Sequence, residues 1–222
     1  MLEPATIEAI TFDCYGTLID WEQGLRDYVT PILAQSKQRD VTPQKWVARW
    51  ERIQFDMLTP YRPYAEVLAR SYDATMQHFG MEAFVDAGAG LARSVSDWPP
   101  FADAKAALRR MAKRRRLAIV SNIDRALLAD SVGRLQAPFT ALVTAEDARA
   151  YKPDPRPLQI AIERLGLAPE RILHAAFGWK YDLGPARALG MRTCFVNRSG
   201  TPVGAPCDVE VASLDALAEL LA

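Results

Sequence analysis

The chain has 222 residues, of which 50% are hydrophobic, so it is long enough to bury a substantial core without disulfide or metal support. Its 27 Lys and Arg residues balance 27 Asp and Glu residues, which argues against a nucleic-acid partner and an acidic tail. No segment has the pattern of a signal peptide or of a membrane-spanning helix, and the three widely spaced cysteines are typical of a reducing compartment. We therefore expect a cytoplasmic protein with no membrane partner.

Short apolar runs bounded by turn residues recur along the chain and are typical of buried strands. They cover residues 7–12, 117–120, 141–143, 172–177, 193–196 and, more weakly, 209–211. Segments with helical spacing separate most of them, at residues 102–114, 125–135, 155–165 and 184–189. This alternation predicts an α/β fold, a Rossmann-like and mostly parallel sheet flanked by helices on both faces.

Residues 21–99 interrupt the alternation. They contain no convincing strand pattern, only long helix-compatible stretches broken at Pro43, Pro60 and Pro63. We expect a helical cap domain, residues 21–99, inserted into a core domain formed by residues 1–20 and 100–222. Such a cap would cover the carboxyl edge of the sheet, where open α/β sheets bind ligands. Its aromatic residues at helical spacing are more typical of a helical core than of a substrate lid. They are Trp46, Trp50, Tyr61 and Tyr64.

Four polar motifs follow the predicted strands. Asp13 ends the first run before a tight turn at Gly16, and it is either a nucleophile or a cap of the loop. Ser121 and Asn122 end the second run and are able to hydrogen-bond an anion. Lys152 lies on a proline-stiffened loop, which suits pairing with a carboxylate. Asp182 enters a helix after the fourth run, as a functional acid or as an N-cap.

In this order the motifs resemble those of the haloacid dehalogenase superfamily. The segments Asp13-Cys14-Tyr15-Gly16-Thr17-Leu18, Ser121-Asn122 and Lys152-Pro153-Asp154-Pro155 are most similar to its L-2-haloacid dehalogenase branch. The resemblance covers the whole core and accounts for the position of the cap. It implies a hydrolase that releases halide from a small 2-haloacid, gives a 2-hydroxy acid through an aspartyl ester, and needs no metal or other cofactor. It is also compatible with a homodimer.

The resemblance implies a role for each matched residue. Asp13 would attack the α-carbon, while Thr17 and Lys152 would orient this carboxylate and keep its pKa low enough for it to stay ionised. Asp182 would position or deprotonate the hydrolytic water, or hold Lys152. The expected substrate-binding residues are Cys14 and Tyr15 through their backbone amides, the Tyr15 ring, Ser121, Asn122 beside the halide, Trp179 and Tyr181.

Three positions depart from the branch. The fourth motif usually has Ser and Asn to hold the hydrolytic water, where this chain has Phe177 and Trp179. A cap Arg receives the halide in the branch, but Glu51 stands at that position, with Arg49 and Arg52 as candidate substitutes. A branch Tyr after the motif Lys corresponds to Leu158. The sequence therefore leaves open how the water and the leaving group are held.

Other functions are also compatible with these motifs. A Mg²⁺-dependent phosphatase or phosphonate hydrolase would bind the metal through Asp13 and Asp182. Tyr15 argues against it, because those enzymes carry a proton-donating Asp there and a phenol with a pKa of about 10 replaces it poorly. Ring opening of a strained small acid and a catalytically idle binding protein are further alternatives. His174, inside a strand pattern, is expected to be structural.

Overall fold

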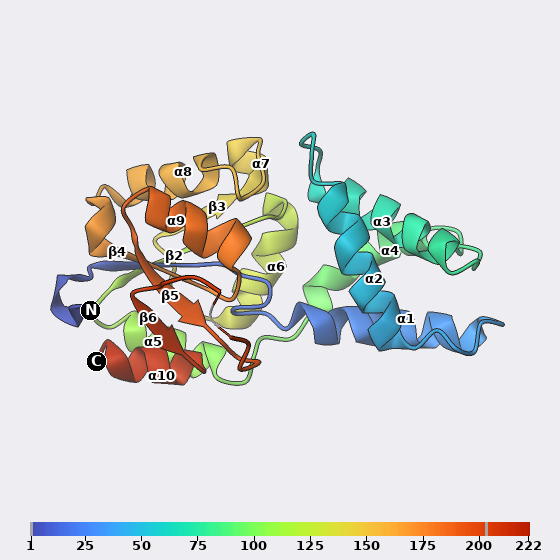
Figure 1. The fold of residues 1–222 in the computed structure, drawn as a ribbon, viewed down its shortest axis with the longest axis horizontal. Coiled ribbons are helices and arrows are strands. Elements are labelled where there is room, and N and C mark those ends of the chain that lie inside the picture. The colour runs from blue at the N-terminus through green and yellow to red at the C-terminus, as the bar shows by residue number, and fades with distance from the viewer. Residues whose placement is uncertain (1, 203) are drawn as a thin grey trace.

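The computed structural model describes residues 2–202 and 204–222, which form an α/β protein (Figure 1). Its sheet has six parallel strands in the order β3-β2-β1-β4-β5-β6. The strands are β1 (Ala9–Phe12), β2 (Arg116–Ser121), β3 (Ala141–Thr144), β4 (Ile172–Ala176), β5 (Arg192–Val196) and β6 (Val209–Val211). The predicted fold class is confirmed. The chain runs from β1 outward to β3 and then returns to β4, so β1 and β4 flank a topological switch point.

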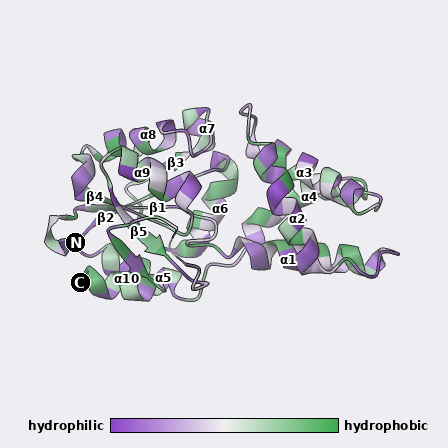
Figure 2. Ribbon diagram, viewed as in Figure 1, coloured by the Kyte–Doolittle hydropathy of each residue, from purple (hydrophilic) through white to green (hydrophobic). Residues whose placement is uncertain are grey.

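Helices cover both faces of the sheet, and alternate residues of the strands face the two layers. Ile10 and Phe12 of β1 pack in the larger apolar cluster, whereas Ala9 packs in the second. The helices of the core are α5 (Ala104–Met111), α6 (Arg125–Leu135), α7 (Ala145–Ala148), α8 (Arg156–Leu165), α9 (Gly184–Ala188) and α10 (Leu214–Leu220). Figure 1 shows α8 and α9 on one side of the sheet and α5 and α10 on the other. Because both faces are covered, the strands are mostly apolar, whereas the helices carry both hydrophobic and hydrophilic residues along their length (Figure 2).

Between β1 and α5 the chain forms four α-helices that lie beside the sheet (Figure 1). They are α1 (Trp21–Gln35), α2 (Pro43–Asp56), α3 (Tyr64–His78) and α4 (Ala87–Ser94). The side chains of Asp20 and Thr42 accept backbone hydrogen bonds at the starts of α1 and α2. Trp46 is fully buried against Tyr72 in the core of this segment, at a ring-centroid distance of 5.7 Å. Within residues 2–202 and 204–222, no helix combines the length and apolarity needed to cross a membrane.

One carboxylate fastens this helical segment to the sheet. Asp124, in the loop after β2, accepts hydrogen bonds from the backbone amides of Tyr64 at 2.7 Å and Ala65 at 2.8 Å. These amides belong to the first turn of α3, whose preceding residue Pro63 makes no side-chain cap. Asp124 therefore accepts hydrogen bonds from amides that have no partner within α3. Its negative charge also interacts favourably with the positive end of the helix dipole.

We expect Asp124→Ala to lower the free energy of unfolding by about 1–3 kcal/mol, because two partly buried amides lose a charged acceptor. Chemical denaturation of the variant and of the unaltered protein measures the difference. Asp130→Ala is the matched control, since Asp130 is exposed on α6 and makes no side-chain hydrogen bond within the described ranges. Equal stability of the two variants would show that Asp124 contributes nothing to the attachment of α3.

Candidate active site

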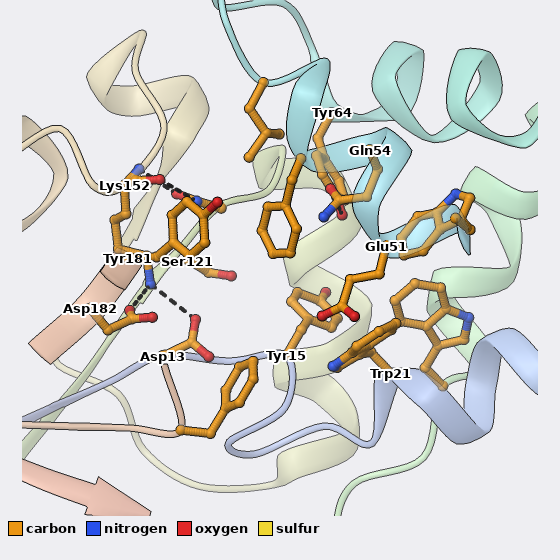
Figure 3. A pocket seen from close by; sticks show the side chains of 16 residues that line it. Asp13, Tyr15, Trp21, Glu51, Gln54, Tyr64, Ser121, Lys152, Tyr181 and Asp182 are labelled. Carbon is orange, nitrogen blue, oxygen red and sulfur yellow. Dashed lines mark hydrogen bonds and ion pairs between the residues drawn. The ribbon is translucent and has the colours of Figure 1, made fainter. Parts of the chain in front are cut away.

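Four polar side chains converge at the carboxyl edge of the sheet (Figure 3). Asp13 follows β1, Ser121 ends β2, and Lys152 lies in the loop between α7 and α8. Asp182 lies in a π-helical turn, Trp179–Leu183, that follows β4. Because β1 and β4 are neighbours at the switch point, the residues that follow these two strands lie in the same crevice.

Lys152 joins the two carboxylates, although only 1% of its surface is exposed. Its ammonium donates to Asp13 Oδ1 at 3.0 Å, to the carbonyl oxygen of Val120 at 2.8 Å, and to Asp182 Oδ1. These bonds use all three of its protons. The lysine is therefore held rigidly, with its charge between two acids.

Thr17 fixes the other oxygen of Asp13. Its hydroxyl donates to Asp13 Oδ2 at 3.1 Å and accepts from the backbone amide of Phe177 at 3.1 Å. The predicted partners Thr17 and Lys152 thus contact opposite oxygens of the carboxylate. This arrangement limits rotation of Asp13.

Burial raises the pKa of Asp13 to about 6, even though the Lys152 charge lowers it. The charge of Asp182 raises it further. The ion pair with Lys152 therefore does not bring the pKa of Asp13 below its ordinary value, because desolvation outweighs it. For Asp182, Lys152 and a hydrogen bond from His174 outweigh the effect of burial and lower the pKa. At neutral pH both acids are ionised.

We expect kcat/KM to decline as the pH falls through about 6, because a protonated Asp13 is no longer nucleophilic. The raised pKa places this loss well above the usual range of an Asp. Initial rates between about pH 5 and pH 8 measure it. Circular dichroism at each pH is the control for folding. An acid limb near pH 4, the ordinary value of an Asp, would contradict the burial argument.

Donors without partners lie close to Asp13. The Ser121 hydroxyl is buried, lines the cavity and has no hydrogen-bond partner in the described part of the chain. The backbone amides of Cys14 and Tyr15 also donate to no acceptor within residues 2–202 and 204–222. Buried polar groups are nearly always satisfied, so three free donors indicate a site for an anionic group of a ligand.

The cavity above Asp13 has a volume of about 100 Å³. Its aromatic wall consists of Tyr15, Trp21, Trp50, Phe55, Tyr64, Trp98, Phe177 and Tyr181. Phe55 of α2 stacks on Tyr181 of the π-helical turn at a centroid distance of 4.7 Å, so the helical segment closes over the sheet. The Tyr15 hydroxyl forms a hydrogen bond with the hydroxyl of Ser131 at 2.9 Å. This pairing does not suit a role as the proton donor to a leaving group. The site is therefore small, with a charged floor and an aromatic wall.

The Cys14 side chain lies in the apolar core, and its backbone amide alone is free for a ligand, as expected. The structure places two other predicted binding residues differently from the expectation. Trp179 does not line the cavity, because the π-helical turn directs Tyr181 there instead. Asn122 lines the cavity, but its amide group bonds the backbone of Lys152 at 3.0 and 2.7 Å. This pairing suits positioning of Lys152 better than contact with a halide.

His174, which is expected to be structural, is fully buried and contacts the charged cluster. Its Nε2 lies 3.3 Å from Asp182 Oδ1 and its Nδ1 lies 2.8 Å from the hydroxyl of Thr11. Burial lowers the pKa of His174, so the ring is neutral and supports Asp182 from below. The sequence indicates this role only by the presence of a polar residue within the apolar run 172–177.

The helical segment also supplies residues that the motifs did not reveal, including Trp21 and Gln54. Neither Arg49 nor Arg52 lines the cavity, whereas Glu51 does. Successive helical residues point about 100° apart, so only one of the three faces inward. Leu158 is fully buried in α8 and lies outside the cavity lining.

The donor set does not fit a magnesium ion. The ammonium of Lys152 lies between Asp13 and Asp182, where a bridging cation would bind. In the described ranges, no group of three or more His, Cys, Asp or Glu side chains is arranged to hold a metal. Mg²⁺ prefers several oxygen ligands and a nearly octahedral shell, which this arrangement does not offer.

Asp13, Lys152 and Asp182 form a buried ionic cluster at the switch point of the parallel sheet. This arrangement is typical of an α/β enzyme. The sequence model of the haloacid dehalogenase-like hydrolases matches residues 7–176, and the chain belongs to this family. The protein is therefore a hydrolase, and the resemblance to the haloacid dehalogenase superfamily is confirmed.

Relatives of known activity cover almost the whole chain. Haloacetate dehalogenase H-2 of Moraxella sp. (strain B) is 28% identical over 97% of this chain and 98% of its own length. The (S)-2-haloacid dehalogenase of Pseudomonas sp. (strain YL) is 29% identical over 96% and 94%. The structure of L-2-haloacid dehalogenase from Xanthobacter autotrophicus superposes with a TM-score of 0.83 at 22% identity, covering 97% and 98% of the two chains. The last comparison shows that the fold is shared.

Proposed function

We propose that the protein hydrolyses a small 2-haloacid to a 2-hydroxy acid by nucleophilic displacement from Asp13. The observation that carries this proposal is the buried Asp13–Lys152–Asp182 cluster at the floor of a small cavity. The names of the relatives, which are dehalogenases of haloacetate and of 2-haloacids, support the same substrate class. Residues 21–99 act as the cap domain over the core of residues 1–20 and 100–222.

In the first step the substrate carboxylate binds the Ser121 hydroxyl and the amides of Cys14 and Tyr15. An oxygen of Asp13 attacks C2 of the substrate and forms a C–O bond. The carbon–halogen bond breaks, and the halide leaves with the electron pair. The product of this step is an ester between Asp13 and the acid, and Lys152 loses one of its two carboxylate partners.

In the second step water attacks the Asp13 carbonyl carbon of the ester. The bond between this carbon and the ester oxygen breaks, which releases the 2-hydroxy acid and regenerates the carboxylate. One proton is released to solvent for each turnover. Asp182 holds Lys152 through Oδ1, while its Oδ2 accepts no hydrogen bond within the described ranges and is free to bind the water.

Halide release from racemic 2-chloropropionate and phosphate release from an aryl phosphate, each with and without EDTA, test the proposal. We expect halide release that EDTA leaves unchanged. Repeated turnover in heavy-oxygen water is expected to give a heavier Asp13 peptide, because water oxygen enters the carboxylate through the ester. Phosphate turnover that EDTA abolishes would overturn the proposal in favour of a metal-dependent phosphatase.

A further inference from the structure

Glu51 places a carboxylate in the cavity wall opposite the charged floor. It extends from α2 into the cavity, on the side where Tyr15 and Trp21 lie (Figure 3). Its carboxylate accepts no hydrogen bond and forms no ion pair with any residue in 2–202 or 204–222. Partial burial and the charge of Glu22 raise the pKa of Glu51, and together they outweigh the opposing charge of Arg52.

The charges that line the cavity do not balance. Three carboxylates and one ammonium face it, namely Asp13, Glu51, Asp182 and Lys152, and the described lining contains no Arg. Lys152 is already shared between Asp13 and Asp182. A simple haloacid anion would add another negative charge to this small volume, which like-charge repulsion disfavours. A substrate with its own positive charge would relieve the imbalance.

The surroundings of Glu51 suit a cation. The Trp21 and Trp50 rings line the same cavity at a centroid distance of 5.9 Å. Aromatic faces attract ammonium groups through the ring quadrupole, and a nearby carboxylate adds a direct ion pair. The wall that holds Glu51 therefore offers two kinds of attraction to a protonated amine and none to a halide.

We infer that the substrate is zwitterionic, a small 2-haloacid that also carries a protonated amine bound by Glu51 and the adjacent aromatic faces. This inference rests on the proposed function and names its substrate class. The carboxylate of the substrate binds Ser121 and the free amides, and the amine is retained in the product. Glu51 is thus a specificity-determining residue.

Two pairs of isosteric compounds test the charge alone. The first pair is 3-amino-2-chloropropionate and 2-chlorobutyrate, which differ by an ammonium in place of a methyl group. We expect kcat/KM to favour the amine by at least about 10-fold, a preference typical of a partly buried ion pair. Glu51→Gln should remove most of this preference, and Glu51→Arg should reverse it. Glu66→Gln is the matched control, because Glu66 lies on α3 outside the cavity.

The second pair, β-alanine and butyrate, cannot react and reports binding without turnover. Calorimetric titration of the unaltered protein should show tighter binding of β-alanine, and Glu51→Gln should abolish the difference. Equal binding of the two, or a preference for 2-chlorobutyrate with halide released through Asp13, would overturn the inference and leave the proposed function standing. Preferred binding of β-alanine without halide release would uphold the cation site and overturn the proposed function.

Discussion

Asp13→Asn is expected to abolish turnover, by a factor on the order of 10⁴ or more. An amide oxygen is a far weaker nucleophile than a carboxylate, and no other carboxylate is held by both Lys152 and Thr17 in the described part of the chain. The change is nearly isosteric, so the volume of the site is preserved, and the amide oxygen still accepts a hydrogen bond from Thr17 or from Lys152. Halide release measures the loss.

The same variant should be at least as stable as the unaltered protein. Burial raises the pKa of Asp13 above its ordinary value, so above that value folding must bury a charge that water would favour. The neutral Asn avoids this cost, and Lys152 keeps its pairing with Asp182. Thermal denaturation at neutral pH measures the change in stability. Lower stability of the variant would contradict the burial argument, whereas full activity of the folded variant would exclude Asp13 as the nucleophile.

Lys152→Met is expected to lower the free energy of unfolding by about 3–5 kcal/mol, the usual cost of removing one partner from a buried ion pair. Asp13 and Asp182 would remain buried as like charges without a counter-ion. Turnover should also collapse, because the pKa of Asp13 would rise further and protonate the nucleophile. Chemical denaturation and halide release measure the two effects.

A second substitution tests the cause of this destabilisation. Adding Asp182→Asn to Lys152→Met removes one of the stranded charges, so the double variant should be more stable than Lys152→Met alone. Lys105→Met is the control, because Lys105 is exposed on α5 and forms no ion pair within the described ranges. Additive losses in the double variant would show that the two side chains are not coupled.

The strands of the sheet could be predicted because each one is marked by the hydrophobicity of its own short segment. A parallel strand covered on both faces must be apolar along most of its length, and runs such as residues 7–12 and 117–120 have this character. The observed strands β1 and β2 lie within or overlap these runs. The same logic placed Asp13, Ser121 and Asp182 at the carboxyl edge, since each follows a predicted strand.

Local rules did not predict the turn around Asp182. Helix spacing assumes a regular helix after β4, but residues Trp179–Leu183 form a π-helical turn. The wider turn brings Tyr181 to the cavity wall and leaves Trp179 outside it. The local sequence pattern does not predict a π-helical turn, because its formation depends on how the flanking elements pack.

The sequence by itself determined the fold class, the family and the chemistry of the acids and the lysine, because apolar periodicity and motif order are properties of the chain. Only the tertiary structure decided that Glu51, rather than Arg49 or Arg52, faces the cavity and that His174 supports Asp182. It also decided the pKa of Asp13, which pairing with Lys152 alone would lower and burial instead raises. Desolvation depends on every atom that surrounds a group, and those atoms are brought together only when distant segments pack.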